Sequence, residues 1–537
     1  MDKKIFFNGT ILTMDDEKKK VDNFLAEDGT IVKTGLSEGE LARLEGAEWI
    51  DLSGKTCIPG FHDSHMHMIE YGYNRKYCVD LSEADSVEDM IDRMRRFIEE
   101  NKIPENSWVM GMRWNQENFA DKKMPDRKDL DRVSDKHFVF AKRVCIHIAA
   151  ANSRLLDLCG INEETYPGDP NIGRFPDGTP DGRIYEDAIS GIVLAEKPPL
   201  TVEEIEAIIS DTAKEIRESG FTSVQTDDMK AFSDFQSKKN ILKAYDNLRN
   251  RGKLPVRIFE QIQVSSMEEL RHILKELCEI RADEMFSFDR LKLILDGSLG
   301  ASTAAMGAPY KGTEDQYGLL NFADEEMEEL VSFAYAHRMQ VMCHCIGDRA
   351  MEQAIRIIGK YQEKFDDDRR PRIVHCQICT EHQLEEMSRL RILADIQPAF
   401  VPTDYIIIEK QLEHPENYCL YPWKTMKEHG ITVSGSSDAP VEGYDALYGI
   451  QAAVTRADIS GIPQGGWLPE EKLTAEEALK LYTSQPAYTV FQENHLGKIA
   501  EGYKADIAVL TENPLAVNPQ RIHTIKAEAS YIGGKRG

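Results

Sequence analysis

Eight short apolar runs, separated by helical patterns along the middle of the chain, constrain the fold more than any other feature of this 537-residue sequence. Strand-like runs that alternate with helical stretches indicate βαβ units and a parallel sheet. Eight such units predict an α/β fold, a (β/α)₈ barrel of the TIM type, with its active site at the carboxyl ends of the strands. The runs are residues 56–61, 221–225, 256–261, 291–295, 340–343, 372–374, 393–396 and 431–434.

Roughly 150 residues separate the first run from the second, and a structureless loop of that length is not expected inside a compact domain. This segment has its own apolar runs at residues 108–110 and 138–141 and a helical pattern at residues 87–100. We therefore predict an inserted subdomain or lid over residues 70–218, within a barrel domain of residues 58–497.

Both ends of the chain contain short β-like runs separated by turn signals. Near the start, residues 5–7 and 10–12 flank the turn signal Asn8-Gly9. Near the end, residues 505–510 and 529–533 have the same texture. Closely spaced short strands are typical of a small β-sandwich, and we predict that residues 1–57 and 498–537 pair into one such domain.

Composition excludes some classes of partner. Lys and Arg number 65 against 92 Asp and Glu, a formal net charge of −27. Such a field repels phosphate backbones and anionic lipid, so neither nucleic acid nor a membrane surface is an expected partner. The sequence shows no signal-peptide core and no run of 18 apolar residues. With ten scattered cysteines, we expect reduced thiols in a cytoplasmic protein.

A histidine pair carries the strongest local signal, in the segment Pro59-Gly60-Phe61-His62-Asp63-Ser64-His65-Met66-His67. His65 and His67 are two positions apart, so on an extended chain they point to the same side and can hold one divalent ion. Two hydrogen-bonded surface histidines would give the same pattern.

Further metal-competent side chains each follow a strand-like run: His344, His375 and Asp438. Five candidate ligands at the strand ends of one barrel indicate a metal site rather than five separate structural residues. Imidazole together with carboxylate suits Zn²⁺, and Mn²⁺, Fe²⁺ and Ni²⁺ stay compatible.

Lys292 lies inside the fourth run, between apolar neighbours. One interpretation is a lysine whose amine reaches water from the end of a strand. The other is a lysine carboxylated by CO₂, whose carbamate bridges two metal ions. The Cys376-x-x-Cys379 spacing resembles a redox or zinc pair, but no second pair accompanies it in the sequence, and buried or incidental thiols are the favoured interpretation.

Taken together, these residues resemble the pattern of the amidohydrolase superfamily. That pattern is an HxH pair on the first strand, Lys on the fourth, His on the fifth and sixth, and Asp on the eighth, here His65, His67, Lys292, His344, His375 and Asp438. Motifs at residues 296–300, 344–350 and 436–440 resemble the amidohydrolase-3 branch, which includes N-substituted formamide deformylases. With the tail at residues 497–506, the resemblance spans nearly the whole chain.

The resemblance implies a metal-dependent hydrolase that cleaves a carbon–nitrogen bond in a small non-peptide amide, formamide or cyclic amide. It implies one or two divalent ions, with zinc expected. His65 and His67 would hold one ion and His344 and His375 the other, with carboxylated Lys292 between them. Asp438 would act first as general base and then as general acid.

Two other functions stay open. A deaminase on the same barrel usually keeps one metal and lacks the fourth-strand lysine, so Lys292 argues against it. A non-catalytic binding scaffold would be expected to lose ligands, and here all six are present. Dimers are common among such relatives, so a homodimer is one expectation and the oligomeric state is otherwise open.

The inserted segment is expected to supply substrate contacts. His147 resembles a family position near the substrate, although a structural histidine on a strand explains it equally well. Trp114, Asn115, Arg183 and Glu186 are further candidates, and such residue types also serve in packing or on the surface.

Three other positions complete the sequence-based expectations. His62 and Asp63 precede the histidine pair and are expected to support the metal ligands. The segment Thr226-Asp227-Asp228-Met229 follows the second run, where relatives often have a small residue and Gly. Substrate contacts are therefore expected to differ at this point.

Overall fold

The computed structural model describes residues 2–145, 147–232, 234–365 and 367–537. The chain divides into two compact units. The larger comprises Met1–Glu70 and Val202–Gly537, and the smaller comprises Tyr71–Thr201.

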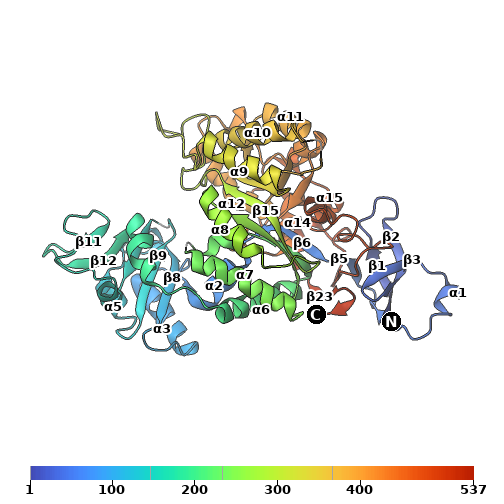
Figure 1. The fold of residues 1–537 in the computed structure, drawn as a ribbon, viewed down its shortest axis with the longest axis horizontal. Coiled ribbons are helices and arrows are strands. Elements are labelled where there is room, and N and C mark those ends of the chain that lie inside the picture. The colour runs from blue at the N-terminus through green and yellow to red at the C-terminus, as the bar shows by residue number, and fades with distance from the viewer. Residues whose placement is uncertain (1, 146, 233, 366) are drawn as a thin grey trace. The chain divides into compact units, whose positions relative to one another are not determined.

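The larger unit is built on an eight-stranded sheet with the order β21-β19-β17-β16-β15-β14-β13-β6. Every neighbouring pair in this order is parallel, and the end strands β21 and β6 contact each other. The sheet therefore forms a nearly closed TIM-type barrel (Figure 1), as the alternating runs predict. Its strands are β6 (Phe61–Met66), β13 (Phe221–Thr226), β14 (Arg257–Gln263), β15 (Phe286–Ile294), β16 (Gln340–Cys345), β17 (Arg372–His375), β19 (Leu393–Ile396) and β21 (Val433–Gly435).

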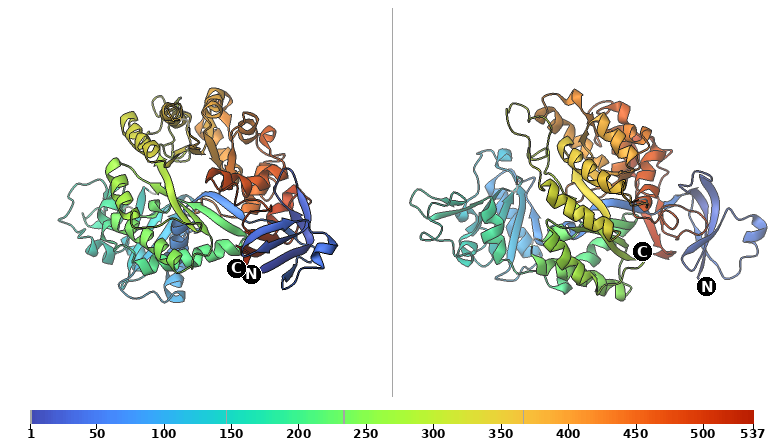
Figure 2. Two further views of the ribbon diagram at one scale, coloured as in Figure 1. Left: turned by 45° about the vertical axis from the view of Figure 1, so that its right-hand side comes forward. Right: turned by 45° about the horizontal axis from the view of Figure 1, so that its top comes forward.

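Helices cover the barrel from outside (Figures 1 and 2). Each turns an apolar stripe towards the strands; α10, for example, buries Ala354 and Ile358. The helices are α6 (Val202–Glu218), α7 (Phe235–Asn250), α8 (Met267–Leu277), α9 (Asp324–Ala336), α10 (Asp348–Gln362), α11 (Glu381–Arg389), α12 (Val401–Gln411), α13 (Trp423–Glu428), α14 (Ala446–Thr455), α15 (Ala475–Leu481) and α16 (Ser484–Thr489).

The first barrel strand lies further along the chain than the sequence predicts. The run at residues 56–61 is split: β5 (Thr56–Pro59) belongs to a different sheet, and the barrel strand is β6. Gly60 separates the two, and a Cβ atom there would stand 2.2 Å from the side chain of Thr222. Only glycine lets the backbone pass β13 this closely, so the chain changes sheets at this residue and carries His65 inside the barrel strand.

Both ends of the chain build a second sheet, with the order β24-β23-β22-β5-β1-β2-β3 and β4 paired to β1. The antiparallel ladder between β22 and β5 joins the two ends, and Figures 1 and 2 draw both termini beside this sheet. Its division into the two layers of a sandwich stays a prediction. The strands are β1 (Lys3–Leu12), β2 (Lys20–Glu27), β3 (Thr30–Thr34), β4 (Glu48–Asp51), β22 (Ile507–Leu510), β23 (Ala527–Ile532) and β24 (Lys535–Arg536), and α1 (Glu38–Leu41) follows β3.

The smaller unit has its own six-stranded sheet, with the order β11-β12-β10-β9-β8-β7, and its own apolar core around Met90, Val109 and Trp114. Its strands are β7 (Cys78–Asp80), β8 (Trp108–Trp114), β9 (Phe138–Arg143), β10 (Ile148–Ala151), β11 (Ile172–Arg174) and β12 (Pro180–Tyr185). Its helices are α3 (Val87–Glu100), α4 (Arg127–Asp131) and α5 (Ser153–Leu158), and α2 (Met68–Tyr77) leads into it.

The far boundary of this unit differs from the predicted insertion at residues 70–218. Residues 202–218 form α6, which contacts β13 and β23 of the larger unit. Its apolar stripe includes Ile205, Ile209 and Ile216, all buried. The helical pattern was visible in the sequence, but periodicity does not tell which unit the stripe packs against.

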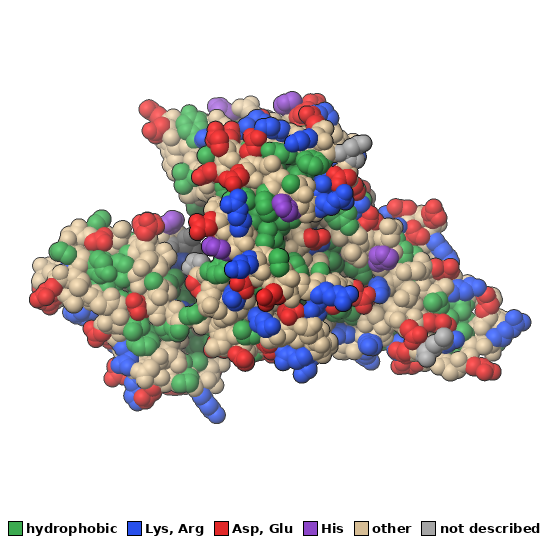
Figure 3. All heavy atoms as spheres, viewed as in Figure 1, with side chains coloured by type: hydrophobic (Ala, Val, Ile, Leu, Met, Phe, Trp, Pro, Cys, Tyr) green, Lys and Arg blue, Asp and Glu red, His purple; other side chains and the backbone are tan. Residues whose placement is uncertain are grey.

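The described residues contain no helix long and apolar enough to cross a membrane. On the face drawn in Figure 3, Asp and Glu side chains lie interspersed with Lys and Arg side chains. The net negative charge is thus spread over this face rather than gathered in one patch.

A buried ion pair joins the barrel to the sheet of the chain ends. Arg257 on β14 donates from Nε to Oδ2 of Asp506 over 2.6 Å, and its second contact to Oδ1 measures 3.2 Å. The two side chains are only 3% and 4% exposed. Removing one partner of such a pair leaves an uncompensated charge in the interior.

We predict that Asp506→Asn lowers the free energy of unfolding by about 3–5 kcal/mol, because Arg257 stays buried without its close counter-charge and keeps only Glu284, at 3.9 Å. Urea unfolding of purified protein measures the change. Lys504→Met is the matched control: Lys504 pairs with Glu284 on the surface, where an ion pair contributes about 0–1 kcal/mol. Equal, small changes in both variants would contradict a structural role for the Arg257–Asp506 pair.

Candidate metal centre

Three side chains at the junction of the first and last barrel strands form the centre. His65, His67 and Asp438 each bring one ligand atom within 4.8 Å of the other two, and all three are buried. Oδ1 of Asp438 lies 3.3 Å from Nε2 of His65 and 3.1 Å from Nε2 of His67. Backbone hydrogen bonds from Asp438 to His65 and from His67 to Ala439 fix the two loops against each other.

Three imidazoles are held through Nδ1 by an oxygen atom that can only accept. Each therefore carries its proton on Nδ1 and leaves the lone pair of Nε2 free, the state that metal ligation requires. The contacts are His65 to Oε1 of Gln261 at 3.0 Å, His67 to the carbonyl of Asp227 at 2.9 Å, and His375 to Oε1 of Gln397 at 2.8 Å.

His344 is held the other way round. Its Nε2 lies 3.1 Å from the carbonyl oxygen of Gly297 and 3.4 Å from Oδ1 of Asp296, so Nδ1 is the nitrogen left free. The ring of His344 lies 4.3 Å from that of His375, which in turn lies 6.1 Å from that of His65.

Lys292 lies among these rings, fully buried, with Nζ 3.4 Å from Nε2 of His65. It comes from β15, the fourth barrel strand in chain order. The structure therefore brings all six predicted ligand residues to one end of the barrel, although the tight cluster of three contains only His65, His67 and Asp438 among the described residues.

Electrostatics at the centre favour neutral imidazole at His65, His344 and His375 and a charged carboxylate at Asp438, whereas Asp438 and Asp227 raise the pKa of His67 despite its burial. Burial holds the pKa values of His65 and His375 well below the usual range and lowers the pKa of His344 to about 3. Burial raises the pKa of Asp438, but the contacts of its Oδ1 with Nε2 of His65 and of His67 outweigh this effect and hold the pKa well below the usual range. Burial lowers the pKa of Lys292 to about 8.

This donor set fits a divalent cation. Oδ1 of Asp438 is buried and has no hydrogen-bond donor among the described residues. Nε2 of His65 and Nε2 of His67 face the same carboxylate oxygen, and the Nζ atoms of Lys292 and Lys230 reach these two nitrogens at 3.4 and 3.5 Å. A buried cluster with more acceptors than donors is costly unless a cation lies between them. Nitrogen and carboxylate oxygen are the ligands that Zn²⁺ and related ions take.

Two of these residues adopt a left-handed backbone. The φ angle is 82° at His375 and 55° at Asp438. Such conformations cost about 1–3 kcal/mol each for a non-glycine residue and gather at functional sites. His375 is the last residue of β17, and Asp438 lies three residues beyond the end of β21.

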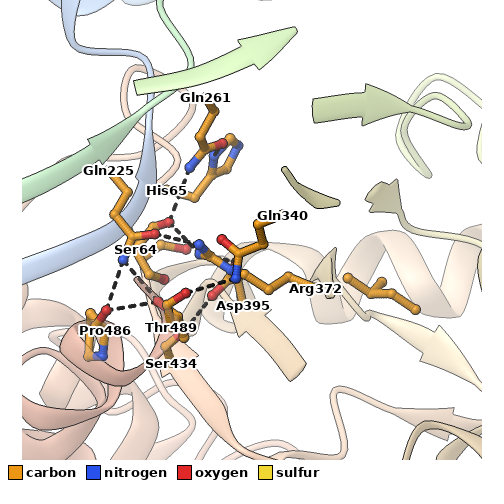
Figure 4. Close-up of polar contacts among 12 residues, drawn as sticks. Ser64, His65, Gln225, Gln261, Gln340, Arg372, Asp395, Ser434, Pro486 and Thr489 are labelled. Atoms are coloured by element: carbon orange, nitrogen blue, oxygen red, sulfur yellow. Dashed lines mark hydrogen bonds and ion pairs between the residues drawn. The ribbon is translucent and has the colours of Figure 1, made fainter. Parts of the chain in front are cut away.

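Arg372 anchors the first strand from below the centre (Figure 4). This fully buried side chain donates to the carbonyl of Ser64 over 2.9 Å and to Oε1 of Gln225 over 2.5 Å. Asp395 neutralises it, with 2.7 Å between Nε and Oδ2. Because Ser64 directly precedes His65, the guanidinium fixes the backbone that carries the first ligand. Sequence reasoning missed this network; its one signal is a charged residue inside each of two otherwise apolar runs.

Asp296 plays a similar part on the other side. Its carboxylate accepts from the backbone N–H groups of Ala305 at 3.0 Å, Ile346 at 3.1 Å and Gly347 at 2.8 Å. It thereby ties the loop after β15 to the loop after β16 and also contacts His344. Asp63, expected as a support, accepts from the N–H groups of His65 and Ser437.

The five predicted substrate residues all lie in the smaller unit. Trp114 is buried in its core and donates from Nε1 to Ala141 over 3.0 Å. His147 and Glu186 contact each other at 2.9 Å and are both exposed. Asn115 accepts from Glu117 and Arg143, and Arg183 pairs with Asp181. Each has a partner inside the unit, and a role in substrate binding stays a prediction.

Cys376 and Cys379 are buried free thiols. Burial holds both of their pKa values well above the usual range, so these thiols are protonated and poor nucleophiles.

Comparison with known proteins agrees with the centre. A family model described as the amidohydrolase family matches residues 48–536, and the chain belongs to this family. It is 31% identical over 539 residues to the putative amidohydrolase YtcJ of Bacillus subtilis, covering 99% of each chain. It is 24% identical over 541 residues to the N-substituted formamide deformylase of Arthrobacter pascens, covering 99% of this chain and 97% of that one.

Among solved structures, an uncharacterized metal-dependent hydrolase from Pyrococcus horikoshii superposes with a TM-score of 0.80 at 26% identity, over 96% of this chain and 99% of that one. A second from Pyrococcus furiosus gives a TM-score of 0.76 at 28% identity, over 96% and 100%. The protein is therefore a hydrolytic enzyme of the amidohydrolase family that depends on a divalent metal.

We predict that a His65→Ala, His67→Ala double variant purifies with much less divalent metal per chain, because both free Nε2 lone pairs of the tight cluster are gone. Elemental analysis of dialysed protein measures the content. His147→Ala is the control, since this exposed histidine lies in the smaller unit. Equal metal in the double variant and the parent would remove the pair from the site.

Proposed function

We propose that this enzyme hydrolyses a carbon–nitrogen bond in a small-molecule amide, formamide or cyclic amide. The observation that carries the proposal is the carboxylate of Asp438, which is buried against His65 and His67 and has no hydrogen-bond donor to Oδ1 among the described residues. A base in this position can take a proton from a water molecule and later return it to a leaving group.

The residues that would hold metal divide into two sets. His65 and His67 would hold one ion and His344 and His375 another, with zinc the expected metal. A divalent ion there supplies Lewis acidity, which polarises a substrate carbonyl and lowers the pKa of water.

Lys292 is proposed to carry a carbamate between the two sets. The reaction needs an unprotonated amine that attacks CO₂ and loses one proton. Burial, which lowers the pKa of Lys292 to about 8, favours the unprotonated amine, and its Nζ lies beside His65. If only one ion binds, Lys292 stays an uncarboxylated structural residue.

The proton path follows from the position of Asp438. Oδ1 accepts the proton of water as its oxygen adds to the carbonyl carbon. As the carbon–nitrogen bond breaks, Asp438 gives this proton to the departing nitrogen, so the carboxylate is regenerated and an acid and an amine leave. Its contacts with His65 and His67 hold its pKa well below the usual range, which favours the charged form that the first step requires.

The comparisons support this bond type over others. One relative of full length is named an N-substituted formamide deformylase and another a putative amidohydrolase. The position of Lys292 among the histidines disfavours a single-metal deaminase. A homodimer and a cytoplasmic location stay predictions.

We predict that Asp438→Asn lowers turnover by about 10²–10⁴-fold, because the amide cannot accept the proton. The isosteric side chain still offers an oxygen ligand, so metal content should stay close to that of the parent. Steady-state kinetics and elemental analysis measure the two effects. Unchanged turnover in a metal-loaded variant would refute the proton-transfer role.

A hydrolysis screen of metal-loaded protein tests the function itself. The panel should contain N-formyl amines, N-acyl amines and cyclic amides, with aminopyrimidines and aminopurines as deaminase substrates. We expect an acid and an amine to be released from at least one amide class, and Asp438→Asn to abolish the signal. Release of ammonia from the aminopyrimidines or aminopurines alone would replace the proposal with a deaminase.

A further inference from the structure

We propose that Asp227 is a specificity residue that binds an ammonium group on the substrate, at the end of β13 beside the metal centre. The inference rests on the proposed function for the scissile bond and adds the substrate class: amides that carry a second, protonated amine. Asp227 directly follows β13 in the chain.

The carboxylate of Asp227 is fully buried, and neither oxygen has a hydrogen-bond donor among the described residues. A carboxylate can only accept, and leaving it buried without a donor costs free energy. Asp228 next to it is equally buried but accepts from Ile69, Thr226 and Tyr245. Of these two adjacent acids, Asp228 therefore has hydrogen-bond donors among the described residues and Asp227 has none.

Strand alternation places Asp227 in the layer of the metal ligands. Gln225 points into the barrel, where it contacts Arg372 and His62. The chain is still paired with β6 two residues later, since the N–H of Asp227 donates to Met66 over 2.8 Å. Successive side chains on a strand point to opposite faces, so Asp227 faces inward one layer above Gln225, and its own carbonyl holds His67.

A second open acceptor lies on the next strand. Gln261 on β14 points inward to His65, so Gln263, two residues on, faces the same side. Oε1 of Gln263 is buried and also has no donor among the described residues. Two neighbouring strands therefore end in unpaired acceptors, and an ammonium group offers three donors and a compensating charge.

Neither a protein side chain nor a metal ion explains the buried carboxylate of Asp227 as well as a substrate ammonium group does. Lys230, Lys238 and Lys292 influence it electrostatically, but none reaches it as a hydrogen bond or ion pair. Nor does Asp227 join any group of three ligand atoms within 4.8 Å among the described residues. A donor that arrives with the substrate would satisfy both oxygens.

Matched ligand pairs test the inference. The probes are monoacetylated ethylenediamine, 1,3-diaminopropane and putrescine, each against the N-alkylacetamide in which a methyl group replaces the ammonium group. Binding is measured by ligand-observed NMR titration on metal-loaded Asp438→Asn protein, so that no probe is consumed. We expect the ammonium member to bind at least tenfold more tightly for at least one chain length.

Asp227→Asn, added to the same protein, should remove this preference because it removes the charge and keeps the shape. Asp228→Asn is the matched control: it removes an equally buried charge one residue away, and the preference should persist. Asp227→Ser serves if the asparagine variant does not fold. Equal or absent binding of both members at every length, or a preference that survives loss of Asp227, would overturn the inference.

Hydrolysis by the parent enzyme separates this inference from the proposed function. A binding preference without hydrolysis of any amide would support the role of Asp227 and refute the hydrolase chemistry. Hydrolysis of amides without the binding preference would do the reverse.

Discussion

The contact between Asp438 and the two histidines His65 and His67 is the interaction on which the rest of the centre depends. It joins the first and the eighth strand, the two that close the barrel, and these strands meet through side chains and loop backbone. A cation held by these three residues would bind the last part of the barrel to the first. Around it, Arg372 and Asp296 fix the backbone that presents the ligands. Asp395 neutralises the first of these buried side chains, and backbone N–H groups satisfy the second.

Most barrel strands and ligand positions can be predicted from the sequence, because each strand is recognisable from its own run of apolar residues. A run of apolar residues followed by His or Asp predicts which side chain lies at the carboxyl end of the strand. This pattern selected His344, His375 and Asp438. The position of the first strand was harder, because Gly60 divides one apolar run between two sheets. That division depends on Thr222, about 160 residues away, and local periodicity carries no information on such a partner.

The supporting charges were not predictable for the same reason. Arg372 and Asp395 look out of place in apolar runs, but only the closed barrel shows that they neutralise each other beneath Ser64. Trp114 illustrates another case: the sequence allows both binding and packing for a large aromatic residue, and only the structure shows that it is buried in the core of the smaller unit. Neighbouring acids are equally ambiguous in sequence, since Asp227 and Asp228 differ only in the donors that the fold brings to them.

The ladder between β22 and β5 has a consequence for the order of folding. It pairs Thr56–Pro59 with Ile507–Leu510, so strands made early in synthesis complete their sheet only when segments made some 450 residues later have left the ribosome. Until then β5 has one edge without a paired strand, and such an edge can pair with strands of other chains and lead to aggregation. Such a chain gains from a barrel that assembles quickly, because the barrel brings its two distant ends within reach of each other.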